Sequence, residues 1–206
     1  MSQSYFFHFF QKFAPVGVAA LGVIAAPGIS EASQIYGFQS AYDPNNWTLV
    51  NDNANGFVDT SNAPDSITLT GSDDGSGFFG TTIFSIPVEA DGTVSFNYNY
   101  DSFNVDGPFF DPFGISLNGT FTQITDDFGS DNQVGSFALN VMEGDIFGFE
   151  VQTVDNIFGP SAVTISNFKA PAAVPEPGTI LGLLAVSGLG LCLKGQSKEP
   201  ELRFTS

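Results

Sequence analysis

Alternation of apolar and polar residues with a period of two is the feature of this chain that most constrains its fold. The segment 93–100 alternates without interruption and places Val94, Phe96, Tyr98 and Tyr100 on one side of an extended strand. The same alternation, or a short apolar run of strand length, recurs at 47–50, 66–70, 81–86, 113–117, 120–124, 136–141, 147–151 and 163–166. No stretch between 33 and 170 has the 3.6-residue period of an amphipathic helix. The sequence therefore predicts roughly nine short strands in an all-β domain.

Turn residues between these segments predict how the strands are connected. Asn118-Gly119 separates two strand segments by two residues, which is the strongest short-range signal of a β-hairpin. Asp91-Gly92 and Glu143-Gly144 mark two further reversals. Short strands with one apolar face each, joined by such turns, favour an antiparallel β-sandwich over residues 33–170, with a jelly roll as the preferred topology.

Charge in the region 33–170 is strongly one-sided. Eighteen aspartates and glutamates lie there, and Lys169 is the only base. Nucleic-acid binding depends on lysine and arginine side chains that neutralise phosphates, and anionic lipid surfaces attract basic segments. We therefore expect no nucleic-acid partner, and no attraction of this region to an anionic lipid surface.

The only histidine, His8, and the only cysteine, Cys192, lie outside residues 33–170. This region thus lacks the residues for Ser-His-Asp or Cys-His catalysis, for histidine or thiolate zinc sites and for disulfide bonds. A glycosidase needs only two carboxyl groups that flank a sugar, but nothing in the sequence singles out a pair. The sequence predicts a protein that is not an enzyme, with a carboxylate-dependent glycoside hydrolase as the least favoured alternative.

Several aspartates are grouped in segments that are expected to form loops. Oxygen ligands on loops suit calcium, so no cofactor is predicted but calcium stays open as a ligand. No segment matches the twelve-residue EF-hand loop, and the favoured alternative is that these aspartates are solvated turn residues. The candidate calcium ligands are Asp73, Asp74, Asp106, Asp111, Asp126, Asp127 and Asp131.

Aromatic side chains suggest a different function, the binding of glycans by stacking on sugar rings. Jelly rolls often bind glycans through exposed aromatic, Asp and Asn side chains, which is an argument from fold alone. The candidate stacking residues are Trp47, Phe109 and Phe110, with Tyr36, Tyr42 and Phe113 as further members of the same two segments. Core packing explains Trp47 at least as well, whereas Phe109 and Phe110 lie in a proline-flanked loop of a kind that is normally exposed.

The N-terminal segment has the layout of a secretory signal peptide. Lys12 precedes an apolar stretch at 13–26, and Ser30-Glu31-Ala32 offers small residues at the positions that signal peptidase requires. The sequence predicts a signal peptide over residues 1–32 with cleavage near Ala32. An uncleaved anchor is the alternative, because the segment before the apolar stretch carries little charge.

The C-terminal segment has the layout of a membrane anchor. The linker 171–178 holds three prolines and is expected to be extended. The run 179–193 has no charged residue and would be about 22 Å long as a helix, shorter than the roughly 30 Å hydrocarbon core. Basic residues in the polar tail 194–206 fit the cytoplasmic side of a final span. We therefore predict a transmembrane helix over 179–193 rather than a helix docked on the domain.

The residues Val174-Pro175-Glu176-Pro177-Gly178, the apolar run and the basic end together resemble the PEP-CTERM sorting signal of exported bacterial proteins. The resemblance covers the chain from Pro171 onward. It implies that an exosortase, a membrane-embedded transpeptidase-like enzyme of bacteria with an outer membrane and an exopolysaccharide system, recognises Pro175, Glu176 and Pro177. Tails of this family usually end within a few basic residues, whereas this chain continues to Ser206. That departure bears on processing and not on topology.

The segments 46–49, 118–121 and 164–168 also resemble a recurrent uncharacterised β-domain that is attached to PEP-CTERM tails, which implies no known activity. Together these features predict an exported protein, anchored in a membrane at least transiently and then delivered to the cell surface or extracellular matrix. The general secretion machinery and an exosortase are the expected partners, and extracellular polysaccharide is a candidate partner. A structural or adhesive role is the leading hypothesis, and a lectin-like glycan-binding module is its alternative.

Overall fold

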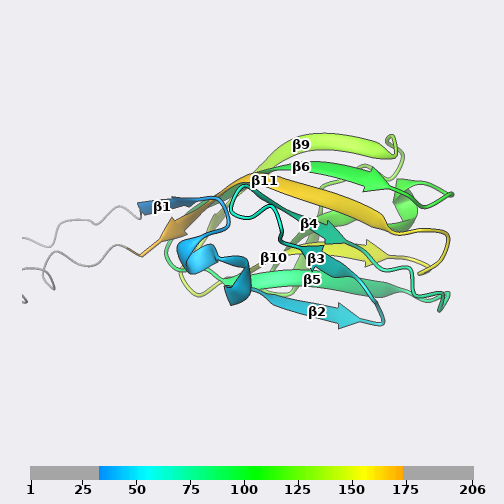
Figure 1. The fold of residues 1–206 in the computed structure, drawn as a ribbon, viewed down its shortest axis with the longest axis horizontal. Helices are drawn as coiled ribbons and strands as arrows, with labels where there is room; N and C mark the ends of the chain where they lie inside the picture. Colours follow the sequence, from blue (N-terminus) through cyan, green and yellow to red (C-terminus); the bar gives the residue numbers. More distant parts are fainter. Residues whose placement is uncertain (1–32, 174–206) are drawn as a thin grey trace, which may run out of the picture.

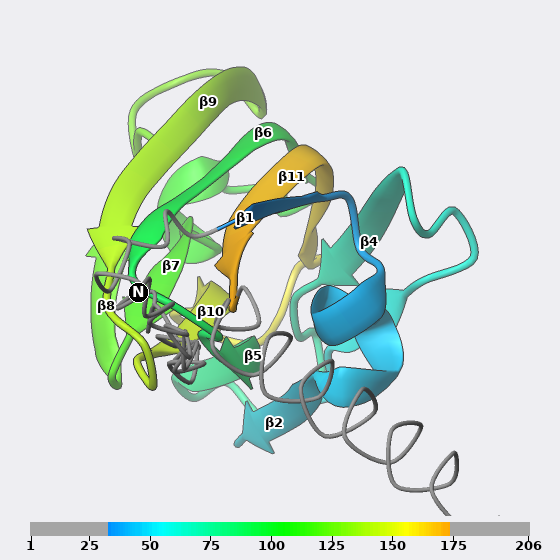
Figure 2. The ribbon, with the colours of Figure 1, turned by 90° about the vertical axis from the view of Figure 1, so that its left-hand side faces the viewer.

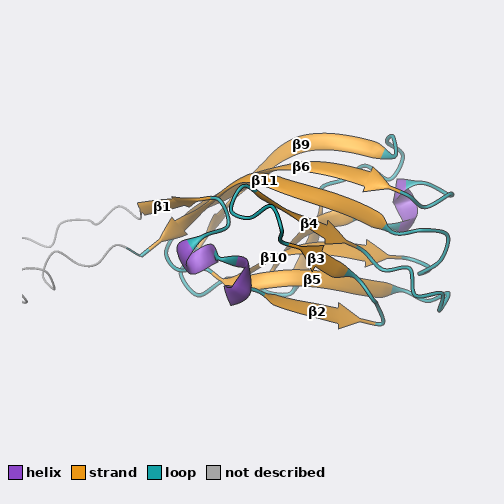
Figure 3. Cartoon of the chain, in the orientation of Figure 1, coloured by secondary structure: helices purple, strands orange, loops and turns teal. Residues whose placement is uncertain are grey.

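Two antiparallel sheets stacked face to face form the fold (Figure 1). The computed structural model describes residues 33–173. In this part of the chain the regular structure is strand, apart from three one-turn 3-10 helices at Ser40–Tyr42 (η1), Pro44–Asn46 (η2) and Pro108–Phe110 (η3) (Figure 3). The prediction of an all-β antiparallel sandwich is confirmed.

Sheet A, as we name it, contains the longest strands. Its hydrogen-bonded order is β3 (Phe57–Asp59), β4 (Ser66–Thr70), β11 (Ser161–Ala172), β6 (Gly92–Ser102) and β9 (Asn132–Val141), and β1 (Ser33–Tyr36) pairs with the last part of β11. Figure 2 shows these strands as one curved layer above the second sheet. Strand β11 is therefore the centre of sheet A, because β4, β1 and β6 all pair with it.

Sheet B covers the inner face of sheet A. Its order is β2 (Thr48–Asp52), β5 (Gly80–Pro87), β10 (Ile146–Thr153), β7 (Phe113–Leu117) and β8 (Thr120–Gln123). From β4 onward each strand lies in the sheet opposite to the strand before it, except that β7 and β8 form a hairpin. This connectivity favours the jelly-roll interpretation.

The turn between β7 and β8 forms where the sequence predicts it. Asn118 and Gly119 have φ values of 53° and 79°, the left-handed conformations that a two-residue turn between twisted strands needs. The Asn118 side chain also ties the turn to the next strand, because its Oδ1 accepts a hydrogen bond from the Ile146 amide at 2.9 Å. The predicted hairpin is confirmed.

An aromatic cluster fills the space between the sheets. Trp47 is only 7 % exposed, and its ring stacks on Phe84 at a centroid distance of 5.0 Å and on Phe149 at 5.5 Å. Its indole N–H donates to the Tyr42 carbonyl at 3.1 Å, so the polar atom is satisfied inside the core. The prediction that Trp47 stacks on a glycan is wrong. Its neighbours in that prediction, Tyr42 and Phe113, are also fully buried.

Both ends of the described chain leave from the same end of the sandwich, because Ser33 of β1 pairs with Ala172 of β11 (Figure 1). The predicted signal peptide with its cleavage at Ala32, the sorting motif at 174–178, the helix at 179–193 and the polar tail at 194–206 lie outside the described residues. Within residues 33–173, no helix is both long and apolar enough to span a bilayer.

Candidate functional site

A β-bulge in β11 shapes the outer face of sheet A. Ser166 pairs with Asn97 of β6 and Lys169 pairs with Ser95, so three steps along β11 stand opposite two steps along β6. The extra residue lets Asn167 adopt a left-handed conformation with a φ of 50°. Phe168 then points into the core, where it is buried, and Lys169 returns to the outer face.

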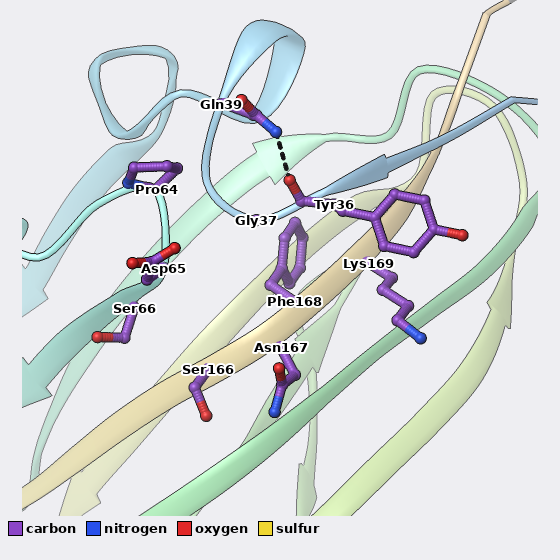
Figure 4. Close-up of a pocket in the computed structure, with 10 residues that line it drawn as sticks. All are labelled: Tyr36, Gly37, Gln39, Pro64, Asp65, Ser66, Ser166, Asn167, Phe168 and Lys169. Carbon is purple, nitrogen blue, oxygen red and sulfur yellow. Dashed lines mark hydrogen bonds between the residues drawn. The ribbon is translucent and has the colours of Figure 1, made fainter.

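The bulge separates two partners on the same edge of β11. Strand β4 pairs with β11 as far as Ser166, and β1 pairs with it from Lys169 onward. A hollow of about 480 Å³ opens between them, and Tyr36, Gln39 and Asp65 are among the residues that line it (Figure 4). The gap in strand pairing at the bulge thus produces an open site on a surface that is otherwise continuous sheet.

A second hollow, of about 590 Å³, lies on the other side of β11, over β6 and β9. Ser95, Asn97 and Ser136 contribute its polar lining. Asn167 and Lys169 line both hollows, so the bulge stands between them. Each volume falls within the roughly 300–1,000 Å³ of ordinary ligand pockets.

The outer face of sheet A is built mainly from uncharged polar residues. Side chains of cross-strand partners point to the same side of a sheet, so each row of partners can be read from the register. One row across β4, β11, β6 and β9 is Ser66, Ser166, Asn97 and Ser136, and the next is Thr68, Thr164, Asn99 and Val134. Among the outward-facing residues of these strands, Asp59 and Asp101 are the acids. The face therefore carries few charged side chains in a domain that is otherwise strongly acidic.

Tyr36 and Lys169 form an aromatic and cationic pair at the edge of this face. They are direct cross-strand partners, and the Lys169 Nζ lies 5.4 Å from the centroid of the Tyr36 ring. Tyr36 is 59 % exposed, so a face of its ring is open to a ligand. The Gln39 side-chain amide donates to the Tyr36 carbonyl at 2.6 Å, which ties η1 to the end of β1 (Figure 4).

The other predicted stacking residues lie elsewhere. Phe109 is 46 % exposed, and its ring contacts that of Phe110 edge-on at a centroid distance of 5.2 Å. Both belong to η3, at the end of the sandwich away from β1 (Figure 3). The structure therefore does not bring Phe109 and Phe110 together with Trp47 or with the two hollows.

The predicted calcium ligands do not converge. Asp74 accepts a hydrogen bond from the Ser76 amide, and Asp126 accepts one from the Phe128 amide, as turn aspartates do. Asp127 accepts a hydrogen bond from Gln123. Within residues 33–173 no three acidic, histidine or cysteine side chains form a group that could hold a metal ion. The grouping of Asp73, Asp74, Asp106, Asp111, Asp126, Asp127 and Asp131 into a calcium site is thus not found, and the turn interpretation is favoured.

Asp111 is the exception among these acids because it is completely buried. Neither of its carboxyl oxygens has a hydrogen-bond partner in the described structure. Burial raises the pKa of Asp111 to about 7; the neighbouring polar side chains of Thr153 and Asn104 oppose this shift, and the charge of Asp155 adds to it. Asp111 therefore keeps its proton at acidic pH and loses it around pH 7. It lies in the loop that follows η3, away from both hollows.

A hydrolase would need two carboxyl groups on either side of one sugar. The two hollows together are lined by a single acid, Asp65. The hollows can therefore hold and orient a polar ligand, but they do not supply an acid and a base for glycoside cleavage.

Sequence reasoning overlooked Lys169 and Asn167 as site residues. One signal was available, since Lys169 is the only base between 33 and 170. Nothing in the sequence marks the bulge at Asn167, because a residue inserted into one strand leaves the apolar pattern on either side of it intact.

Comparisons with known proteins show likeness of fold only. No protein-family model matches the chain, and no curated protein sequence matches it. Solved structures that resemble it include a family 35 carbohydrate-binding module from Clostridium thermocellum, with 16% identity, 69% of this chain and 100% of that chain covered, and a TM-score of 0.37. The family 11 module of a cellulosomal cellulase from the same organism shows 11% identity, covers 71% and 98%, and has a TM-score of 0.38. A family 29 module shows 10% identity, covers 74% and 96%, and has a TM-score of 0.40.

Proposed function

We propose that this protein is exported to the cell surface or extracellular matrix and that its sandwich binds glycan at the β11 bulge. The observation that carries the proposal is the combination of an exposed aromatic ring, Tyr36, with two neighbouring hollows on a polar face that carries few charges. The structural or adhesive role expected from the sequence is compatible with this function, because glycan binding would attach the protein to a polysaccharide matrix.

The chemistry of the face suits sugars. A sugar ring offers a C–H face that can lie against the Tyr36 ring, and hydroxyl groups that both donate and accept hydrogen bonds. The hollows are lined by Ser hydroxyl groups and by Asn and Gln side-chain amides, which can also both donate and accept hydrogen bonds. The acids of the domain lie mostly off this face, so a neutral ligand would meet a surface of mainly uncharged polar groups.

Export is proposed from the two ends of the sequence. The N-terminal segment supports entry into the general secretion pathway, and the segment from Pro171 onward supports recognition by an exosortase and transient anchoring in a membrane. Because Ser33 and Ala172 are neighbours, both signals would extend from the end of the sandwich near β1. The loops at the opposite end would then point away from the membrane.

Mass spectrometry of protein recovered from the cell surface tests this route. We expect a mature chain that begins at Ser33 and no longer carries residues 179–206. A matched control with Pro175, Glu176 and Pro177 all replaced by alanine should keep the tail and stay in the membrane fraction. Recovery of the intact chain, Met1 to Ser206, from the cytosol would contradict the proposal.

Replacement of Tyr36 by alanine tests the glycan site. We expect Tyr36→Ala to weaken binding of the full chain to immobilised polysaccharides by about fivefold, because the loss of one aromatic stacking surface costs on the order of 1 kcal/mol. The matched control is Phe128→Ala, since Phe128 is 91 % exposed and lies in the loop before β9. Equal binding by the Tyr36 variant and the parent protein would exclude this site.

A further inference from the structure

Lys169 is an isolated positive charge at the centre of the proposed site. It is the only base among residues 33–173, against eighteen acids. No ion pair within 4.0 Å forms in the described part of the chain, so Lys169 is not paired with any of those acids. Its contact with Tyr36 is a cation–π interaction, which leaves the ammonium group able to bind an anion.

The bulge in β11 determines where Lys169 lies on the outer face of sheet A. A residue at this register position lies between Tyr36 of β1 and Ser95 of β6, and it borders both hollows. The first hollow contains an acid, Asp65, but the second contains none. An anionic group above the second hollow would therefore meet a lysine and uncharged Ser and Asn side chains.

On this basis we propose that the site selects glycans that carry carboxylates, with a uronic acid residue in the second hollow and its carboxylate on Lys169. This inference rests on the proposed glycan-binding function. A neighbouring sugar of the same chain would lie in the first hollow against Tyr36. Polymers that alternate or mix neutral and uronic sugars match this arrangement of one aromatic ring and one cation.

The acidity of the whole domain does not prevent such binding. Charges separated by more than the Debye length, about 8 Å at physiological ionic strength, are largely screened, whereas a direct contact between an ammonium group and a carboxylate is screened much less. The strand positions of this face carry only Asp59 and Asp101, and both lie in rows beyond Ser66 and Asn97, away from Lys169. Asp65 lines only the first hollow, and Lys169 is the one charged side chain that lines the second.

Affinity electrophoresis of the full chain in a non-ionic detergent tests the inference, with gels that contain a neutral glucan, a polyuronate or a sulfated galactan. We expect the polyuronate to bind about tenfold more tightly than the glucan. Lys169→Gln should weaken binding of the polyuronate far more than binding of the glucan and so abolish this preference, while Lys169→Arg should keep it. Phe128→Glu is the charge-matched control, because it also makes the net charge more negative by one but lies outside both hollows.

The outcomes separate the inference from the function on which it rests. If the glucan and the polyuronate bind equally, or if Lys169→Gln weakens both to the same extent, while Tyr36→Ala still weakens binding, the carboxylate preference is wrong and the glycan site stands. Tighter binding of the sulfated galactan than of the polyuronate would also overturn it. If no polysaccharide binds, the proposed function fails as well.

Discussion

Trp47→Ala is expected to lower the free energy of unfolding by about 3–5 kcal/mol, the range measured when large aromatic residues are removed from a core. This is a large part of the roughly 5–15 kcal/mol by which a typical domain is stable. The loss should appear as a lower midpoint in thermal unfolding followed by circular dichroism, with no new glycan-binding defect beyond that caused by unfolding.

The physical reason is the position of Trp47 between the sheets. Its ring lies nearly parallel to those of Phe84 and Phe149, at interplanar angles of 15° and 8°, and it meets Phe168 of sheet A at 67°. Removal of the indole would leave a cavity bordered by rings from both sheets, and the buried Tyr42 carbonyl would lose its donor.

Two variants make this prediction specific. Trp47→Phe keeps an aromatic ring in the stack and should cost less than Trp47→Ala, although it still loses the hydrogen bond to Tyr42. Phe128→Ala removes an exposed ring and should change stability by less than about 0.5 kcal/mol. A Trp47→Ala protein as stable as the parent would show that the aromatic stack is not what holds the sheets together.

The sheets could be predicted where a strand has one buried and one exposed face, because its sequence then alternates. Residues 93–100 alternate in sequence, and their even-numbered members do lie on the inner side of β6. Strands β1 and β3 could not be predicted in the same way, because four and three residues are too few to establish a period. Pairing with β11 and β4 makes these segments strands, and such pairing is a property of the folded chain.

The site was harder to predict than the sheets. Whether an aromatic residue is buried depends on strands that pack against it in space but are distant from it in the sequence. Trp47 and Tyr36 both precede or end a short strand, yet Trp47 lies in the core while Tyr36 lies on the surface. Tyr36 faces outward because it pairs with Lys169, more than a hundred residues away. The hollows depend in turn on the bulge at Asn167, for which the local sequence carries no signal.

The burial of Asp111 could not be predicted from the sequence either. Aspartate beside proline is typical of exposed turns, and nothing in the sequence distinguishes Asp111 from the other loop aspartates. In the structure its backbone carbonyl accepts hydrogen bonds from Tyr100 and Ser161, which draw this turn into the interior. Burial of the carboxyl group is therefore a consequence of tertiary contacts, and it has a measurable effect on stability.

The stability of the protein is expected to decrease as pH rises, because Asp111 is buried as the neutral acid. Its pKa is raised from 3.8 to about 7 in the folded protein, so between these values the folded state binds a proton that the unfolded state has released. The contribution is complete below pH 3.8 and is lost as pH rises through 7, for a total of about 4 kcal/mol. Between pH 5 and pH 8 we expect a decrease of about 2.5 kcal/mol from this group.

Asp111→Asn should remove this dependence and make the protein more stable than the parent at pH 8, since the amide stays neutral. Trp47, the only tryptophan, lies in the core, so its fluorescence can follow urea unfolding at each pH, with a chelator present to exclude bound calcium. The control Glu143→Gln removes an exposed carboxyl group and should keep the dependence of stability on pH seen in the parent.

If the parent is equally stable at pH 5 and pH 8, or if Asp111→Asn leaves the dependence of stability on pH unchanged, Asp111 is not protonated in the folded state. An Asp111→Asn protein that is less stable than the parent at pH 8 would instead indicate that the ionised carboxylate is stabilised within the core.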